Sequence, residues 1–213
     1  MAVRTFSIIT EADARTIERG TTVQLAKGGH VTPLAQDTLR EKRITVVPAG
    51  TAAPSLPADL APVSPVKRLV VASDHTGLAL KAALVSAFRS RAVAVTEAGA
   101  ASTDPVDYPD VAGTAALAVA RGEADAAIVV DGSGLASAMA ANKVKGVRAA
   151  MCLNATLARY AREHMGANVL TLGSTLVSPA EAVEIAVTFT TTGMTEARYL
   201  RRLLKVRRLE DAR

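Results

Sequence analysis

The sequence has one cysteine, no tryptophan, few other aromatic residues and no long apolar run. The single thiol, Cys152, has no second cysteine to form an internal disulfide, which fits a reducing compartment. Aromatic residues make up 3% of the chain, so the stacking side chains typical of nucleic-acid-binding proteins are scarce. No segment approaches the roughly 20 apolar residues of a membrane helix, and the first residues lack a secretory signal. We therefore expect a cytoplasmic protein that binds neither nucleic acid nor membrane.

What is present is typical of a globular protein. The 213 residues are 49% hydrophobic and 21% charged, which is enough for one ordinary core and a smaller unit. The formal charge is +5, but much of the positive excess lies in the segment 198–213. This concentration at one end indicates a basic helix rather than a nucleic-acid surface.

Residues 1–47 have the pattern of a small α+β extension. Thr10 followed three residues later by Asp13 predicts a helix start, and Gly20 fits its end. The elements expected after it are a strand over 22–25, a turn at Gly28 and Gly29, a helix from Thr32-Pro33 to Arg43 and a strand over 44–47. So small a unit would hardly fold alone, and we expect it to dock on a partner or on itself in an oligomer.

The segment 48–66 is predicted to be a linker, because it holds five of the nine prolines, with alanine and serine between them. From residue 67 to 213 the pattern alternates between strands and helices. The predicted strands cover 69–72, 93–95, 126–130, 147–151 and 169–172, and the predicted helices cover 76–89, 110–121, 155–164 and 179–190. This alternation predicts an α/β fold, a Rossmann-like doubly wound five-stranded parallel sheet.

The stretch 126–143 is the most informative part of the chain. An apolar strand ends at Asp131, and Gly132 and Gly134 then lead into a helix. Glycines allow unusual dihedral angles and close approach, and the amides of a helix start favour an anion. Ligands collect at the carboxyl ends of parallel strands, so Asp131 is a candidate for chemistry. The alternative, that Asp131 only caps the turn, remains open.

Other polar residues follow predicted elements. Asp74 and His75 follow the first strand of the domain, although a helix-capping Asp74 and a solvated His75 explain them as well. His164 lies near a helix end, where the alternative is that it only complements the helix dipole. Arg198 and Arg202 are four residues apart, so both lie on one helix face and fit a phosphate, although a solvated basic helix explains them as well. The pattern contains no metal-ligand spacing, so we expect neither a metal nor a cofactor.

Two resemblances to known families add to these expectations. The segment GGHVTPLAQDTLREKRITVV resembles an N-terminal element of enzymes associated with bacterial microcompartments, including cobalamin adenosyltransferases. An unrelated helical cap is the alternative. The resemblance implies docking of residues 1–47 to microcompartment shell or core proteins, and hence a location inside a microcompartment. We then expect deletion of residues 1–66 to leave the chemistry intact.

The second resemblance covers about residues 67–208 and is to type B ribose-5-phosphate isomerases and galactose-6-phosphate isomerase subunits. It is carried by the segments 73–77, 106–109, 122–125, 132–134, 140–144, 146–149, 161–164 and 167–173. It implies a dimer, or a dimer of dimers, with active sites shared between subunits. The residues it assigns to substrate binding are Asp74, His75, Tyr108, Gly132, Gly134, Leu135, Ala136, Ser137, Asn142, Arg198 and Arg202.

The resemblance has departures at the catalytic positions. Asp131 stands where many members of the family have a catalytic cysteine, and Ser137 stands where another branch has a glutamate. Ala136 replaces a usual glycine, and Met165 replaces a usual asparagine. We expect Asp131 to be the base, Ser133 to help form the oxyanion hole and His164 to open the sugar ring, in a cofactor-free aldose-ketose isomerisation through an enediolate. The substrate expected is ribose 5-phosphate or a close analogue. The alternative is a catalytically silent sugar-phosphate-binding or partner subunit.

Overall fold

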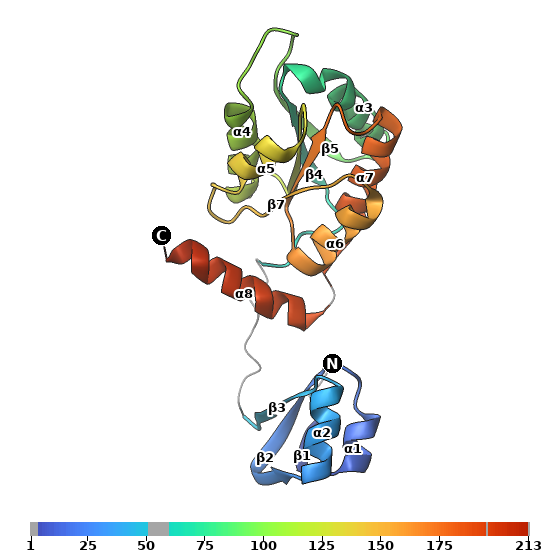
Figure 1. Cartoon of the computed structure of the whole chain (residues 1–213), viewed down its shortest axis with the longest axis vertical. Coiled ribbons are helices and arrows are strands. Elements are labelled where there is room, and N and C mark those ends of the chain that lie inside the picture. The colour runs from blue at the N-terminus through green and yellow to red at the C-terminus, as the bar shows by residue number, and fades with distance from the viewer. Residues whose placement is uncertain (1–3, 51–59, 195, 213) are drawn as a thin grey trace. The chain divides into compact units, whose positions relative to one another are not determined.

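A computed structural model describes residues 4–50, 60–194 and 196–212 (Figure 1). The chain divides into two compact units, Met1–Leu56 and Pro57–Arg213. The division falls within the segment 48–66 that the sequence predicts to be a linker. Within the described residues, no helix is both long and apolar enough to cross a membrane.

The N-terminal unit is a small parallel sheet with two helices. Strands β1 (Thr5–Ile9), β2 (Thr22–Val31) and β3 (Thr45–Pro48) pair in that order. Helices α1 (Glu11–Thr16) and α2 (Pro33–Glu41) pack on it around a core of their own. The predicted α+β character is confirmed, but the strand β1 was not expected from the sequence.

The helix starts of this unit are as predicted, whereas one helix end is not. Thr10 and Asp13 form a reciprocal capping box, and the Thr32 side chain caps the helix that begins at Pro33. The first helix ends at Thr16 rather than near Gly20. Its carbonyl end is instead capped from outside, because the ammonium group of Lys42 donates to the carbonyls of Ala14, Arg15 and Ile17.

The predicted turn at Gly28 and Gly29 is wrong. Both glycines lie inside β2, where the pairing with β1 jumps from Phe6↔Leu25 to Ile8↔His30. Gly28 has a φ of +79°, and a Cβ on Gly29 would lie 2.5 Å from a carbonyl oxygen of β1. The glycines therefore form a bulge that keeps one long strand paired, which is the other use of glycine in a strand.

The C-terminal unit contains the predicted five-stranded parallel sheet, in the order β5-β4-β6-β8-β7. Its strands are β4 (Arg68–Ser73), β5 (Ala94–Gly99), β6 (Ala126–Asp131), β7 (Ala149–Met151) and β8 (Val169–Gly173). Side chains of β6 alternate between two cores: Ala126, Ile128 and Val130 face one, and Ala127 and Val129 face the other. The strand is buried on both faces, as a central strand of a doubly wound sheet must be.

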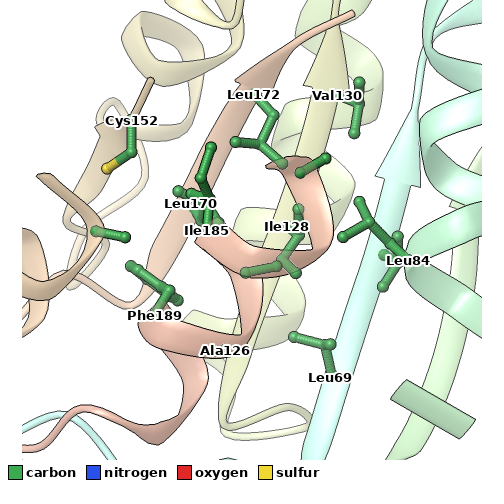
Figure 2. Close-up of a cluster of buried hydrophobic side chains, with 14 of the residues drawn as sticks. Leu69, Leu84, Ala126, Ile128, Val130, Cys152, Leu170, Leu172, Ile185 and Phe189 are labelled. Atoms are coloured by element: carbon green, nitrogen blue, oxygen red, sulfur yellow. The ribbon is translucent and has the colours of Figure 1, made fainter. Parts of the chain in front are cut away.

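Helices cover both faces of this sheet. They are η2 (His75–Gly77), α3 (Leu78–Arg89), α4 (Tyr108–Ala120), α5 (Leu135–Ala141), α6 (Ala155–Met165), α7 (Pro179–Thr191) and α8 (Ala197–Asp211). Residues of α3, α6 and α7 share one core cluster, and residues of α4 and α5 share the other. Figure 2 shows the first cluster, including Leu84, Ile185, Phe189 and Cys152. Burial raises the pKa of the Cys152 thiol to about 11, so this residue packs rather than reacts.

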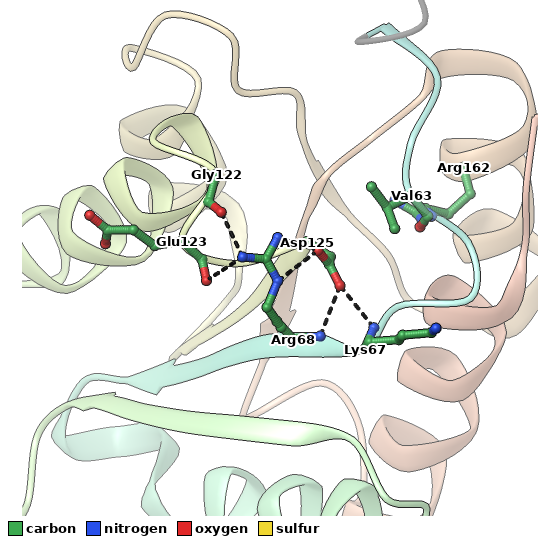
Figure 3. Close-up of polar contacts among 7 residues, drawn as sticks. All are labelled: Val63, Lys67, Arg68, Gly122, Glu123, Asp125 and Arg162. Carbon is green, nitrogen blue, oxygen red and sulfur yellow. Dashed lines mark hydrogen bonds and ion pairs between the residues drawn. The ribbon is translucent and has the colours of Figure 1, made fainter.

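Two polar clusters fix the amino-terminal edge of the sheet (Figure 3). The carboxylate of Asp125 accepts hydrogen bonds from the backbone of Lys67 and Arg68 and from the Arg68 guanidinium. Arg162 is fully buried, and burial first, with a contribution from Arg148, lowers its pKa to about 10. Its guanidinium donates to the carbonyls of Val63, Ala167 and Thr192.

The segment from Leu60 to Val66 therefore belongs to the C-terminal unit rather than to a linker. Leu60 and Val66 are each 4% exposed, and Val63 supplies a carbonyl to the buried guanidinium of Arg162. The sequence prediction of an extended linker over 48–66 fails at this end, because apolar residues between the prolines find a core to pack against. The part of that prediction that falls on residues 51–59 lies outside the described residues.

Deletions that end on either side of this segment are predicted to behave differently. Deleting residues 1–56 should leave the urea unfolding midpoint of the C-terminal unit nearly unchanged. Deleting residues 1–66 should lower its free energy of unfolding by about 3 kcal/mol or more, because two buried side chains and one partner of a buried cation are lost. Urea unfolding followed by circular dichroism measures both. Equal midpoints for the two truncated chains would contradict this placement of residues 60–66.

Candidate functional site

The candidate site is built at the carboxyl ends of three neighbouring strands, β4, β6 and β8. Register pairs Ser73 with Val130 and Asp131 with Gly173, so the three strand ends lie level. The loops that follow the strands therefore meet at one edge of the sheet. This is the edge at which open parallel sheets bind ligands.

Asp131 lies at the centre of this edge and is 4% exposed. One carboxylate oxygen, Oδ1, accepts hydrogen bonds from the backbone N–H groups of Ser133 at 2.7 Å and Gly134 at 2.5 Å. The other oxygen, Oδ2, accepts from the backbone N–H of Ser137 at 2.8 Å. The amides of the glycine-rich turn thus converge on this carboxylate, an anion within the chain itself.

These hydrogen bonds decide the charge of Asp131. Burial alone would raise its pKa, but the Ser137 side chain and the backbone N–H groups of Gly134, Ser137 and Ser133 outweigh burial and lower the pKa below its ordinary value of 3.8. The Ser137 hydroxyl is fully buried and, among the described residues, makes no hydrogen bond of ordinary geometry. The hydroxyl lowers the pKa of Asp131 because it lies close to the carboxylate. Asp131 is therefore ionised at neutral pH.

Gly134 holds the turn in a form that other residues would strain. Its φ is +76°, and a Cβ would lie 2.9 Å from the backbone of Leu172 and 3.0 Å from that of Gly173. Its carbonyl accepts a hydrogen bond from the hydroxyl of Thr171. The turn is thus pressed against β8, which is why both its dihedral angles and its lack of a side chain matter.

Asp74 and His75 lie at the same edge, as predicted. Asp74 caps η2, since its Oδ1 accepts from the backbone N–H and the hydroxyl of Thr76. The Nδ1 atom of His75 accepts a hydrogen bond from the backbone N–H of Val106, so the neutral ring carries its proton on Nε2. That contact links His75 to the loop that leads to Tyr108, the first residue of α4, which is 40% exposed.

Sequence reasoning missed the loop after β8. Ser174 donates its backbone N–H to the carbonyl of Asp131, and Thr175 bonds to the carbonyl of Gly132 through both its N–H and its hydroxyl. The Ser174 hydroxyl also lies 3.4 Å from that of Thr76. In the sequence, these residues are marked only by their place after a predicted strand. The sequence pattern does not show that β8 lies beside β6, and their contacts depend on that strand order.

His164, Arg198 and Arg202 lie at the other end of the sheet. His164 is near the end of α6, just before β8 begins, whereas Asp131 lies level with the end of β8. A strand of this length spans about 16 Å. Helix α8 packs at the same end as His164, where Leu203 lies beside Gly166. Within the described chain, the predicted catalytic and substrate-binding residues therefore form two groups on opposite edges.

The remaining predicted residues have clear local positions. Leu135 is 62% exposed and Ala136 is half-buried in the first turn of α5. Asn142 ends that helix, and its side-chain amide both donates to the carbonyl and accepts from the N–H of Ala149. Asn142 is thus committed to joining α5 to β7, and its proposed contact with substrate stays a prediction.

One cavity lies away from the glycine-rich turn. It has a volume of about 500 Å³ and is bounded by Arg148, Asn168, Leu203 and Arg207 at the amino-terminal edge of the sheet. Among the described residues, no group of three or more His, Cys, Asp or Glu side chains gathers in a way that would hold a metal ion.

The match to a known family lies within the C-terminal unit, which also holds the glycine-rich turn. The sequence profile of the Ribose/Galactose Isomerase family matches residues 69–206. Ribose-5-phosphate isomerase B of Escherichia coli is 40% identical over 111 residues, which are 52% of this chain and 74% of the relative. A probable ribose-5-phosphate isomerase B of Mycoplasma genitalium is 38% identical over 144 residues, 67% of this chain and 95% of the relative.

Solved structures agree with this comparison. Ribose-5-phosphate isomerase B of Clostridium thermocellum has a TM-score of 0.67 and 37% identity, and the match covers 68% of this chain and 98% of that one. The Mycoplasma genitalium enzyme, solved with bound ribulose 5-phosphate, has a TM-score of 0.65 and 36% identity, with coverage of 68% and 96%.

The hydrogen bonds of Asp131 predict a pH-dependent contribution to stability. Because its pKa is lower when folded than the ordinary 3.8, the contribution is complete above that value and is lost as pH falls through the folded pKa. Asp131→Asn should lower the free energy of unfolding by about 2 kcal/mol at pH 7, and the difference should shrink at pH 3. Urea unfolding of both proteins at the two pH values measures this. A difference that is the same at both would contradict it.

Proposed function

The chain belongs to the Ribose/Galactose Isomerase family, and from this premise we propose that it interconverts ribose 5-phosphate and ribulose 5-phosphate. It is an aldose-ketose isomerase of phosphorylated sugars, as the relatives and structural neighbours are. The proposed substrate rests on the names of those relatives and on the neighbour that binds ribulose 5-phosphate. The relatives are named as isomerases, which gives no support to the alternative of a silent subunit.

The observation that carries the mechanism is the buried, ionised carboxylate of Asp131 between the ends of β4 and β8. Its Oδ2 accepts one backbone hydrogen bond where Oδ1 accepts two, so Oδ2 has the greater remaining capacity as an acceptor. We assign to Oδ2 the removal of the proton from C2 of the open-chain aldose. The C–H electron pair forms the C1=C2 double bond and the carbonyl pair moves to the C1 oxygen, which gives an enediolate. When the proton returns to C1, the hydroxyl proton of O2 passes to O1 and C2 becomes the carbonyl carbon of the ketose.

The other residues keep the roles expected of them. Asp74, His75 and Tyr108 lie at or beside the edge that holds Asp131 and are proposed to bind the sugar hydroxyls. Ser133 is proposed to stabilise the oxyanion through its hydroxyl, since its backbone N–H is already bonded to Asp131. The hydrogen bonds that fix the loop also lower the pKa of Asp131. The carboxylate therefore stays ionised but is a weaker base.

A second copy of the chain is proposed to complete the site. The group formed by His164, Arg198 and Arg202 lies at the opposite edge of the sheet from Asp131, so one chain does not surround one small substrate. Exposed apolar side chains on α5 and α6 support an interface between copies. They are Leu135 at 62%, Met139 at 69%, Leu157 at 43% and Tyr160 at 41% exposure.

The N-terminal unit is proposed to have a role separate from the chemistry. Residues 5–48 pack around their own core, and the sequence profile of the family begins only at residue 69. This independence supports a docking element, for which microcompartment shell or core proteins are the partners suggested by resemblance. The location proposed for the chain is correspondingly the cytoplasm, including the interior of a microcompartment.

The assignment of Asp131 is tested by comparing two aspartates. Asp131→Asn should lower kcat for ribose 5-phosphate by about 100-fold or more, because the proton acceptor is lost. Asp125→Asn removes a carboxylate at the opposite edge, which pairs with Arg68, and should leave kcat within about twofold of the unchanged protein. A coupled assay of ribulose 5-phosphate formation measures both.

The results separate the possible readings. Full turnover by Asp131→Asn would contradict its role as base. An unchanged protein that turns over no member of a panel of tetrose, pentose and hexose phosphates, yet binds one of them, would contradict the isomerase function and restore the silent-subunit alternative.

Subunit mixing tests the shared site. Asp131→Asn and His164→Ala proteins are each expected to be nearly inactive, because each lacks one half of every site. Unfolding and refolding them together should restore about a quarter of wild-type activity, since half of the random dimers are mixed and each mixed dimer has one intact site. Refolding each variant alone is the control. A mixture that stays inactive, although mixed dimers form, would contradict a site shared between copies.

A further inference from the structure

Helix α8 places Tyr199 in contact with both His164 and Arg198, two of the predicted site residues at the amino-terminal edge of the sheet. Tyr199 is 6% exposed, and its ring centroid lies 4.5 Å from that of His164. A second ring, that of Tyr160, lies 4.9 Å from the same imidazole and nearly parallel to it, at 15°. Ring contacts of this kind fix the plane and position of an imidazole. The His164 side chain stays 33% exposed, so it is held without being sealed off.

The same tyrosine also holds a guanidinium. Its hydroxyl oxygen accepts a hydrogen bond from Arg198 at 2.9 Å, and the guanidinium carbon lies 4.8 Å from its ring centroid. The guanidinium of Arg202 lies 5.8 Å from that ring. Glu196 forms an ion pair with Arg198, and this contact restricts the movement of the guanidinium from another side. A cation against an aromatic face and a hydrogen bond at the ring's edge restrict different motions.

We propose that Tyr199 is a positioning residue that holds the His164 imidazole and the Arg198 guanidinium in one geometry, so that ring opening and phosphate binding are set together. The inference rests on the proposed function, which gives those two groups their tasks. A tyrosine has only two side-chain torsions, so one well-packed ring fixes both neighbours at low entropic cost. Small displacements of catalytic groups reduce rates strongly, and a shared support keeps their separation constant.

Two substitutions separate the two contacts of Tyr199. Tyr199→Phe keeps the ring and removes the hydroxyl, so KM for ribose 5-phosphate should rise by about 3- to 10-fold with little change in kcat. Tyr199→Leu also removes the ring, so kcat should fall by about 10-fold as well. Leu203→Ala is the matched control: it weakens the packing of the same helix beside Gly166 and leaves Tyr199 itself unchanged.

A spectroscopic measurement reports on positioning without turnover. The ring protons of His164 are assigned by their loss in the His164→Gln spectrum, among the three histidines of the chain. The ring current of a nearby tyrosine shifts such resonances, so Tyr199→Leu, which removes a ring 4.5 Å from the imidazole, should move them, whereas Tyr199→Phe and Leu203→Ala should leave them nearly unchanged. Titration with inorganic phosphate should show weaker binding for both Tyr199 variants.

The outcomes distinguish this inference from the proposed function. An unchanged His164 resonance in Tyr199→Leu, or unchanged phosphate binding in Tyr199→Phe, would overturn it. It would also be overturned if Leu203→Ala reproduced the same changes in resonance, KM and kcat, because they would then come from loosening of the helix. The expected resonance and phosphate changes in a protein without isomerase activity would support the inference and overturn the proposed function alone.

Discussion

The buried carboxylate of Asp131 is the interaction on which the carboxyl edge of the sheet depends. Its two oxygens gather the amides of Ser133, Gly134 and Ser137, and the backbone carbonyl of the same residue receives the N–H of Ser174. A single residue, through its side chain and its backbone carbonyl, therefore joins β6, the turn after it and the loop after β8. The turn would otherwise hold several amides pointing at one place, which is favourable only when an anion fills that place. Here the chain supplies its own anion.

This arrangement has a chemical consequence for the family's reaction. A carboxylate that accepts three amide hydrogen bonds stays ionised, but each bond reduces its tendency to take up a proton. In the proposed mechanism, Asp131 takes the place of the thiol that the family resemblance implies for many relatives, and its negative charge already holds the loop. The direction of the strands imposes the second constraint. Residues after β4 and β6 lie at one edge, and residues before β8 lie at the other, which is why we propose that two copies complete the site.

Much of the fold was predictable because its local signals agree with its packing. The strand that ends at Asp131 is apolar up to that residue, as burial on both faces requires, and Thr32-Pro33 and Ser178-Pro179 open helices as their capping chemistry predicts. The bulge at Gly28 and Gly29 was not predictable, since a turn and a bulge need the same residue. The packing of residues 60–66 was also missed, because proline content masks an apolar segment that finds a distant partner.

The candidate site divides in the same way. The places of Asp131, Asp74 and His75 could be predicted, because Asp131 ends β6 and the other two come just after β4. Thr175 and Tyr199 could not, because their roles depend on strand order and on a contact between α6 and α8.

The central claim is that two copies of the chain enclose one phosphorylated sugar, and a crystal structure with ribulose 5-phosphate tests it most directly. The phosphate should contact Arg198 and Arg202 of one copy while the carbon chain lies against Asp131 of the other. A sugar phosphate held entirely by residues of a single chain would contradict it.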